Sequence, residues 1–315
     1  MTVTDDDLSG PPVIAVIGPT ATGKSDLAVT LAQRLGAEIV NADSMQLYAG
    51  MDIGTAKLTV AERGGISHHL LDVWPLSKSA AVAEYQRLGR EAIDDIRGRG
   101  KVALLVGGSG LYLRGVLDRL DFPGESPHIR ARLATELAEH GALALHTRLA
   151  AVDPVAAAAI QPGNGRRIVR ALEVIEITGR PFVARMPAFD SAFYRSVQIG
   201  LDRPDLDDRV PLRVHRMLEL GLLDEVRELL PLGLRDSPTA AKALGYQQLL
   251  QVLDDDGTLS GDLNEAIELT VRGTLRFVRR QRSWFRRDPR VHWLDSSTPA
   301  LAEQAWRLIS PTLSG

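Results

Sequence analysis

The octapeptide Gly18–Ser25, with the sequence Gly-Pro-Thr-Ala-Thr-Gly-Lys-Ser, constrains the fold of this chain more than any other stretch. The pattern G-x-x-x-x-G-K-[ST] binds phosphate when it connects a buried strand to a helix. The apolar run Val13–Ile17 precedes it, and apolar residues recur at the helical period through residues 26–35. We therefore predict an α/β fold, a P-loop core with a parallel sheet flanked by helices.

The loop itself supplies the first candidate site residues. Backbone N–H groups at the start of a helix are unpaired, so they can surround a phosphate, and a lysine adds a positive charge. The hydroxyl of Ser25 is a candidate ligand for Mg²⁺. The candidate phosphate-binding residues are Gly18, Pro19, Thr20, Ala21, Thr22, Gly23, Lys24 and Ser25. The motif leaves the reaction open, because kinases, ATPases, GTPases and some transferases share it.

Two later strands bring polar residues to the same edge of the sheet. The strand predicted at residues 37–41 is followed by Asp43, and the strand predicted at residues 102–106 is followed by Gly107-Gly108-Ser109-Gly110. Ligands of open α/β sheets bind at the carboxyl ends of the strands. Asp43 is therefore a candidate general base or Mg²⁺ partner, and an Asp that caps a turn with Ser44 is the alternative.

The glycines after the second of these strands are unusual for a hydrolase. P-loop hydrolases commonly end such a strand with an Asp that helps to hold Mg²⁺. Glycine instead predicts that the backbone approaches a ligand closely, and a tight turn is the alternative. Ser109 can donate or accept a hydrogen bond at the same edge.

The rest of the pattern predicts a core interrupted by helices. We expect a first core segment at residues 11–121, a helical insertion domain at 122–189, and a second core segment at 190–315 with basic C-terminal helices. Asp207 is the expected cap of a helix that ends near Gly221. Further helices are expected at residues 79–98, 128–140, 142–151, 154–160, 165–178 and 262–287, and further strands at residues 70–73, 196–201 and 291–294.

Composition excludes several classes of protein. The chain of 315 residues has no cysteine, which rules out disulfides, thiolate nucleophiles and cysteine-bound zinc. Its first ten residues are polar and acidic, unlike a signal peptide, and no apolar run reaches the length of a membrane span. We expect a cytoplasmic protein without a membrane partner. Because the formal net charge is −3, any contact with nucleic acid must come from a local basic patch.

Arginines cluster at three places that could form such a patch. The clusters are Arg166, Arg167 and Arg170; Arg209, Arg213 and Arg216; and Arg272, Arg276, Arg279, Arg280, Arg282, Arg286 and Arg287. The last cluster has almost no acids to balance it and is interleaved with Phe277, Trp284 and Phe285. Guanidinium groups pair with phosphates, and both they and aromatic rings stack on bases, so this cluster suits RNA. Surface solubility is an equal alternative for the first cluster.

Several stretches together resemble the tRNA dimethylallyltransferase family, the bacterial tRNA isopentenyltransferases. They are Gly18–Ser25, Asp43–Gln46 with Tyr48 and Gly50–Lys57, Gly107–Tyr112, Arg170–Val174, Gly245-Tyr246 and Arg280–Arg286. The resemblance spans nearly the whole chain. It implies the transfer of a dimethylallyl group from dimethylallyl diphosphate to N6 of adenosine 37, beside the anticodon of tRNA, with release of diphosphate and formation of N6-dimethylallyladenosine.

The resemblance also implies a role for individual residues. The loop with Lys24 would hold the diphosphate leaving group with Mg²⁺ as cofactor, and Asp43 would accept the proton from N6. Ser109 stands where the family has a threonine at the reacting centre and keeps the hydroxyl. Arg213 resembles the family arginine that reaches the diphosphate. We expect the enzyme to be a monomer.

The candidate tRNA contacts follow from the same resemblance, and we expect them on the anticodon stem-loop. They are Asp43, Ser44, Met45, Gln46, Ser109, Arg130, Arg166, Arg167, Ile168, Val169, Arg170, Lys242, Gly245, Tyr246, Gln247, Arg279, Arg280, Trp284 and Arg286. Two other classes stay open, a small-molecule kinase and a noncatalytic RNA-binding ATPase or chaperone. The helix rich in arginine and aromatic residues argues against the first, and the glycines at the strand end argue against the second.

Overall fold

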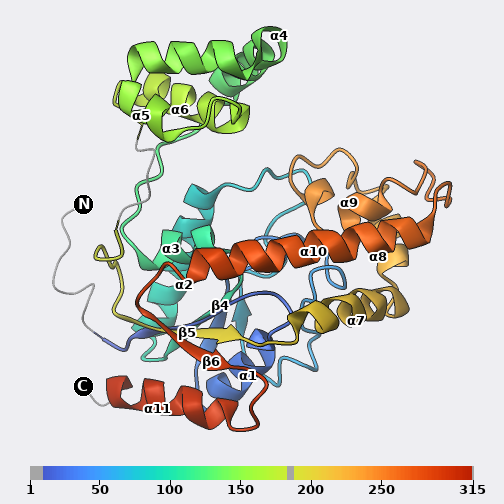
Figure 1. Cartoon of the computed structure of the whole chain (residues 1–315). Coiled ribbons are helices and arrows are strands. Elements are labelled where there is room, and N and C mark those ends of the chain that lie inside the picture. The colour runs from blue at the N-terminus through green and yellow to red at the C-terminus, as the bar shows by residue number, and fades with distance from the viewer. Residues whose placement is uncertain (1–9, 183–187, 314–315) are drawn as a thin grey trace. The chain divides into compact units, whose positions relative to one another are not determined.

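The computed structural model describes residues 10–182 and 188–313 (Figure 1). The chain forms two compact units: unit 1 joins Met1–Arg119 to Ala192–Gly315, and unit 2 is the intervening Leu120–Ser191. Within the described residues, unit 1 contains a six-stranded sheet whose strands all pair in parallel, and unit 2 is helical. The predicted α/β fold with a parallel sheet flanked by helices is confirmed.

The order of the strands in the sheet is β3-β2-β4-β1-β5-β6. The strands are β1 (Val13–Ile17), β2 (Glu38–Asn41), β3 (His68–His69), β4 (Ala103–Gly107), β5 (Ser196–Asp202) and β6 (Val291–Asp295). Parallel strands are covered on both faces, so β1 and β4 read as continuous apolar runs in the sequence, and every residue of both is buried. Central β1 pairs with β4 on one side and β5 on the other, which places the Gly18–Ser25 loop in the middle of the carboxyl edge.

Helices cover both faces of this sheet. Alternate residues of β1 point to opposite sides: Val13, Ala15 and Ile17 join one apolar cluster, and Ile14 and Val16 join another. The first cluster includes side chains of α2 (Val82–Gly98) and α3 (Gly110–Leu117). The second includes side chains of α1 (Lys24–Leu35) and α11 (Leu301–Leu313). The candidate site therefore has a rigid three-layer support.

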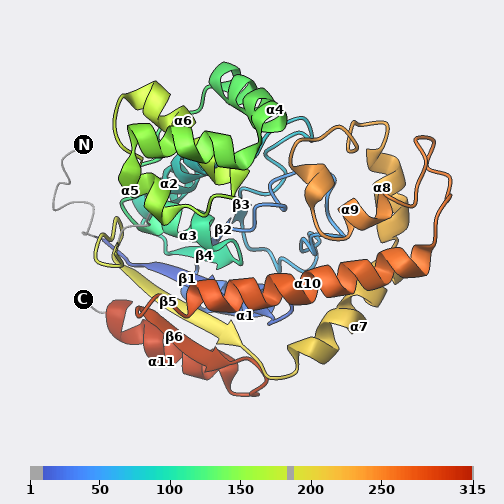
Figure 2. The same cartoon turned by 45° about the horizontal axis from the view of Figure 1, so that its top comes forward.

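A second group of helices lies beyond the strand ends. They are α7 (Leu206–Glu219), α8 (Leu222–Leu229), a 3₁₀ turn at Ala240–Lys242, α9 (Tyr246–Leu249) and α10 (Leu263–Phe285). The long helix α10 runs beside α7 in both views (Figure 2), and Val271, Leu275 and Val278 pack against Leu206 and Val210. None of the helices in the described part of the chain is long and apolar enough to cross a membrane.

Unit 2 is built from α4 (Pro127–Val152), α5 (Pro154–Ala159) and α6 (Gly165–Thr178). Its core is formed by side chains such as Leu133, Leu149, Ile168 and Leu172. The two helices expected at residues 128–140 and 142–151 both fall within α4, which is interrupted at Gly141, where φ is 77°. The expected all-helical character of this segment is confirmed for residues 127–178.

Three local expectations were wrong. The strand expected at residues 70–73 does not form, and the short β3 ends before it at His69, because Leu70 and Asp72 have positive φ angles of 62° and 59° that a strand does not tolerate. Helix α2 begins at Val82 rather than at residue 79. The residue before α7 is Asp205, so Asp207 lies in the first turn and is not the cap. These errors concern ends of elements, where local sequence signals are weakest.

Candidate active site

The Gly18–Ser25 loop turns the chain from β1 into α1, which begins at Lys24. Gly18 has a φ of 140°, and a Cβ atom there would lie 2.3 Å from the carbonyl oxygen of Leu201, so only glycine fits. Thr22 Oγ1 and Lys24 Nζ donate to the carbonyl oxygen of Pro19 at 2.9 and 2.6 Å. The lysine ammonium is therefore folded back onto its own loop.

Ala21 holds the strained position of this loop. Its φ is 65°, which is unfavourable for a residue with a Cβ atom. Arg209 Nε of α7 donates to the carbonyl oxygen of Ala21 at 3.3 Å, and the Ala21 side chain packs against the cluster that contains Leu206 and Val278. Helices α7 and α10 therefore both stabilise the loop conformation.

Asp43 lies at the carboxyl end of β2 in a turn held by side chains. Its backbone N–H donates to Asn41 Oδ1 at 2.9 Å, and its Oδ1 accepts the N–H of Met45 at 3.0 Å. The capping geometry that was the alternative for Asp43 is thus present, through Met45 rather than Ser44. The hydrogen bond from Met45 engages Oδ1 of Asp43, whereas Oδ2 makes no hydrogen bond within the part of the chain that the structure describes. The turn therefore fixes the orientation of the Asp43 carboxylate and leaves Oδ2 able to accept a proton or a hydrogen bond from a substrate.

Lys24 and Arg213 lie close enough to Asp43 and to each other to interact electrostatically. Burial lowers the pKa of Lys24 to about 8, with Asp43 opposing the shift and Arg213 adding to it. Burial also lowers the pKa of Arg213, with Asp43 opposing and Arg209 adding to the effect. Two partly desolvated cations beside one carboxylate leave an excess of positive charge, which an anion would neutralise.

Ser109 meets the Asp43 turn from β4. Its Oγ accepts the N–H of Ser44 at 3.1 Å and lies 3.3 Å from Ser44 Oγ, and its own N–H donates to the carbonyl oxygen of Ala42 at 3.3 Å. The structure therefore brings Ser109 together with the turn of Asp43, as the strand-end argument predicted.

The glycines beside Ser109 have a different explanation from the one expected. A Cβ atom at Gly107 would lie 2.2 Å from the Ala42 oxygen, and one at Gly108 would lie 2.3 Å from Gln281 Nε2. A Cβ atom at Gly110 would lie 2.1 Å from Trp284 Nε1. Protein groups fill the space that was expected to admit a ligand, so these glycines serve the packing of α10 and β2 against the turn.

The Gly50–Lys57 segment is held by a buried acid that the sequence did not reveal. Glu225 accepts the N–H groups of Asp52, Ile53 and Gly54 at 2.9, 2.6 and 3.2 Å, and it also accepts the hydroxyl of Tyr246. Lys57 Nζ pairs with Asp52 and Asp72.

That segment in turn holds the side chain of Gln46. Gln46 Nε2 donates to the carbonyl oxygens of Thr55 and Ala56 at 3.1 and 3.4 Å. Glu225 lies in an ordinary amphipathic helix, and no pattern distinguished it. Lys57, by contrast, ends the Gly50–Lys57 stretch that resembles the family, so the sequence could have identified it as important to the site.

The candidate tRNA contacts have very different surroundings. Arg166, Arg167, Lys242, Gln247, Arg279, Arg280 and Arg286 are exposed, and Ser44, Met45, Gln46 and Trp284 are half-buried. Ile168, Val169, Gly245 and Tyr246 are buried, so their side chains support the fold. Arg130 and Arg170 both pair with the buried Glu173 of unit 2.

The arginine cluster of α10 is more balanced than the sequence indicated. Asp202, at the end of β5, accepts hydrogen bonds from Arg282 at 2.9 Å and from Arg286 at 3.0 Å. Burial raises the pKa of Asp202, but the hydrogen bonds from these two arginines outweigh it and the net pKa is lowered. Arg276, Arg279, Arg280 and Arg287 of this cluster are exposed, and Arg279 and Arg280 are the ones among these four that were predicted to contact tRNA.

The three arginines that were predicted to form one cationic face on α7 have different surroundings. Arg209 contacts the Gly18–Ser25 loop, Arg213 lies beside Lys24 and Asp43, and Arg216 pairs with Glu219 at 3.0 Å. Only the first half of the helix therefore faces the candidate site.

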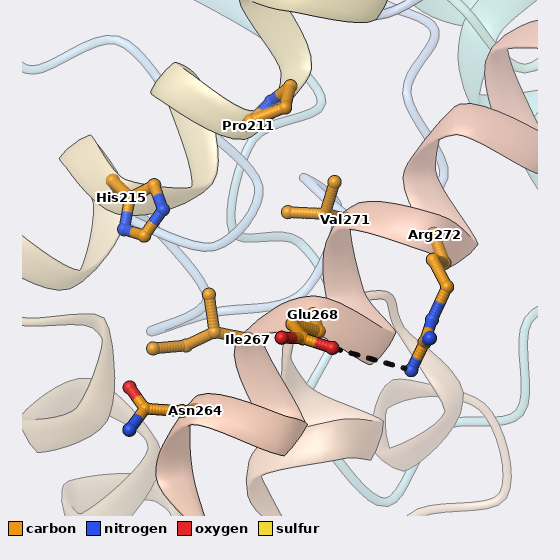
Figure 3. A pocket seen from close by; sticks show the side chains of 7 residues that line it. All are labelled: Pro211, His215, Asn264, Ile267, Glu268, Val271 and Arg272. Carbon is orange, nitrogen blue, oxygen red and sulfur yellow. Dashed lines mark ion pairs between the residues drawn. The ribbon is translucent and has the colours of Figure 1, made fainter.

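A surface hollow of about 500 Å³ lies between α7 and α10 (Figure 3). It is lined by Pro211, His215, Asn264, Ile267, Glu268, Val271 and Arg272. Arg272 reaches toward Glu268 with 3.9 Å between the charged atoms. None of the candidate catalytic residues lines it, so we assign the chemistry to the strand ends, where the titratable groups converge.

The donor set for a metal ion is sparse. The described residues contain no group of three or more His, Asp or Glu side chains that could hold a metal. Mg²⁺ needs no such group, because it is commonly bound by one or two protein oxygens together with phosphates and water. The Ser25 hydroxyl at the start of α1 fits that pattern.

The fold and the site define an α/β protein with a candidate anion site at the carboxyl edge of a parallel sheet. The chain belongs to the IPP transferase family, whose model matches residues 46–288. It is 65% identical over 286 residues to the "tRNA dimethylallyltransferase" of Streptomyces coelicolor, covering 90% of each chain. It is 62% identical to the protein of the same name from Thermobifida fusca, covering 94% of each chain.

Two solved structures are similar over most of the chain. One is a tRNA isopentenylpyrophosphate transferase from Bacillus halodurans, with a TM-score of 0.69, 38% identity, and coverage of 96% of this chain and 97% of that one. The other is a eukaryotic dimethylallyltransferase described as acting on tRNA, with a TM-score of 0.76, 25% identity, and coverage of 96% of this chain and 77% of that one. The family predicted from sequence is confirmed.

The lowered pKa of Lys24 predicts how anion binding depends on pH. Inorganic diphosphate should bind more weakly as the pH rises through about 8, because Lys24 then loses its charge in the free protein. Calorimetric titration between pH 7 and 9 would measure this. The Lys24→Arg variant stays charged and corrects for ionisation of the ligand, so the ratio of its affinity to that of the parent should rise with pH. A constant ratio contradicts the assignment.

Proposed function

We propose that this protein transfers a dimethylallyl group from dimethylallyl diphosphate to N6 of adenosine 37 in tRNA and releases diphosphate. The observation that carries the proposal is the convergence of Lys24, Arg213 and Asp43 at the Gly18–Ser25 loop. Two half-buried cations suit a departing diphosphate, and a fixed carboxylate suits an amine that must lose a proton. The names of the relatives support the same reaction.

The cations stabilise the leaving group. Negative charge develops on the bridging oxygen as the carbon–oxygen bond breaks, and preorganised donors in a site of low polarity act strongly on such charge. Lys24 would exchange its hydrogen bond to Pro19 for one to the diphosphate, and the N–H groups at the start of α1 would add to it. Ser25 and the diphosphate oxygens would hold Mg²⁺, which supplies further neutralisation of charge.

Asp43 serves as the general base in this proposal. The lone pair of an adenine N6 amine is delocalised into the ring, so removal of a proton as the new C–N bond forms favours the reaction. The turn that engages Oδ1 leaves Oδ2 for that proton. Ser109, beside the same turn, can donate to or accept from the reacting base through its hydroxyl.

The exposed arginines would bind the tRNA backbone. Arg279 and Arg280 lie on α10, the helix that also carries Trp284 beside Gly110. Unit 2 offers Arg166 and Arg167, which are exposed at the start of α6. A net charge of −3 means that these local patches, rather than the whole protein, would attract the RNA. The kinase alternative is not favoured, because the relatives are named tRNA dimethylallyltransferases and not kinases.

Mass spectrometry of nucleosides tests the reaction itself. Unmodified tRNA incubated with the protein, Mg²⁺ and dimethylallyl diphosphate should yield N6-dimethylallyladenosine, and a transcript with guanosine at position 37 should not. ATP in place of the prenyl donor should give no modified nucleoside and no ADP. Formation of ADP with a small acceptor would replace this proposal with a kinase.

The role of Asp43 is tested by Asp43→Asn. The variant keeps the shape and one hydrogen-bonding oxygen but cannot take the proton, so single-turnover rates should fall by about 10²–10⁴. Its tRNA affinity and melting temperature should stay near the parent values. Asp224→Asn, an exposed position on α8, is the matched control. Near-parental turnover of Asp43→Asn would make this residue a turn cap only.

The role of α10 is tested by the double variant Arg279→Gln/Arg280→Gln. Each lost phosphate contact should reduce the slope of log affinity against log salt by about 0.7 to 0.9. The double variant Arg87→Gln/Arg307→Gln removes the same charge from exposed positions on α2 and α11 and should keep the parental slope. An equal slope in both double variants would place the tRNA patch elsewhere.

A further inference from the structure

The side chain of Gln281 joins two loops that are distant in sequence. Its Oε1 accepts the backbone N–H of Thr20 at 3.1 Å, and its Nε2 donates to the carbonyl oxygen of Gly108 at 3.0 Å. The two partners fix the orientation of the Gln281 amide, because the N–H of Thr20 must face the amide oxygen and the carbonyl of Gly108 must face the amide nitrogen. Gln281 is buried, with 5% of its surface exposed, so neither bond competes strongly with water.

The residues around this bridge are closely packed. The Gln281 amide occupies the space that a Cβ atom of Gly108 would need, and one helical turn later Trp284 does the same at Gly110. Both contacts lie on one face of α10, since residues three apart are neighbours on a helix. The turn that carries Ser109 is therefore pressed against α10 on both sides of the serine.

Helix α10 is itself fixed to the sheet beside this bridge. Arg282 donates to the Asp202 carboxylate at 2.9 Å and to the carbonyl oxygen of Arg203 at 2.7 Å. These bonds lie at the carboxyl end of β5, the neighbour of β1. Gln281 thus extends from a helix that the sheet edge already holds in place.

We propose that Gln281 is a positioning residue that sets the separation between the Gly18–Ser25 loop and the turn of Ser109. It holds the diphosphate loop and the reacting-centre hydroxyl in register without touching the substrate. Its bond to Thr20 also engages that N–H, so the diphosphate is bound by other donors of the loop. The proposal rests on the proposed function for the identity of the two sites that it joins.

Two variants disrupt the bridge, one by removing both hydrogen bonds and the other by removing only the bond to Gly108. Gln281→Met keeps the length of the side chain and removes both hydrogen bonds. Gln281→Glu can still accept from Thr20 but sets an oxygen against the Gly108 carbonyl. We expect kcat to fall about a hundredfold in both, because misplacement of reacting groups by about 1 Å has that effect. The dissociation constant for tRNA should change by less than about twofold, because Gln281 is buried and does not face the RNA.

A stability control and a direct readout accompany these rates. Ile309→Val removes a buried methyl group from the opposite face of the sheet and should leave kcat unchanged. Hydrogen exchange of the Thr20 amide should be faster in Gln281→Met and unchanged in Ile309→Val. This readout needs no turnover, so it tests the bridge even if the parent protein fails to prenylate tRNA, a result that would overturn only the proposed function.

Three results would overturn the positioning role. The first is a kcat of Gln281→Met within about threefold of the parent. The second is unchanged exchange at Thr20. The third is a loss that appears as weaker tRNA binding, which would make Gln281 an RNA contact. Slower turnover, faster exchange and preserved tRNA affinity together support it.

Discussion

The presentation of unpaired backbone N–H groups at the centre of a parallel sheet edge is the constraint on which the site depends. Strand β1 lies between β4 and β5 and delivers the Gly18–Ser25 loop to the start of α1. Because parallel strands end at one edge, Asp43 after β2 and Ser109 after β4 arrive beside the same loop. Lys24 and Arg213 lie beside Asp43 at this edge, and burial lowers the pKa of both cations.

Those parts of the molecule whose signals are local could be predicted from the sequence. The strand–loop–helix unit follows from an apolar run, a glycine pattern and a helical period, each within a few residues. The approach of Ser109 to the Asp43 turn followed from the rule that strand ends converge, and the contact with Ser44 bears it out. The helical character of unit 2 followed from periodicity, and the break predicted between residues 140 and 142 falls at Gly141, where the backbone of α4 is not helical.

The remaining features depend on tertiary contacts that leave no periodic trace. Gln281 meets Thr20 across most of the chain, and Glu225 meets Ile53 across more than half of it. The strand-end glycines were interpreted as a ligand approach because a single sequence does not show that Gln281 and Trp284 fill that space. Asp202 likewise pairs with Arg282 and Arg286 from another element, which a count of charges along α10 missed. Such polar contacts determine the geometry of the site, whereas the periodic apolar residues determine the strands and helices that support it.

The most direct test of the account is a crystal structure of the protein with inorganic diphosphate and Mg²⁺. We predict that diphosphate lies at the start of α1, that Lys24 Nζ leaves the carbonyl oxygen of Pro19 for a phosphate oxygen, and that Arg213 contacts the same anion. Gln281 should keep both of its bonds. Diphosphate bound in the hollow between α7 and α10, or a Lys24 that stays on Pro19 with the anion elsewhere, would contradict the account.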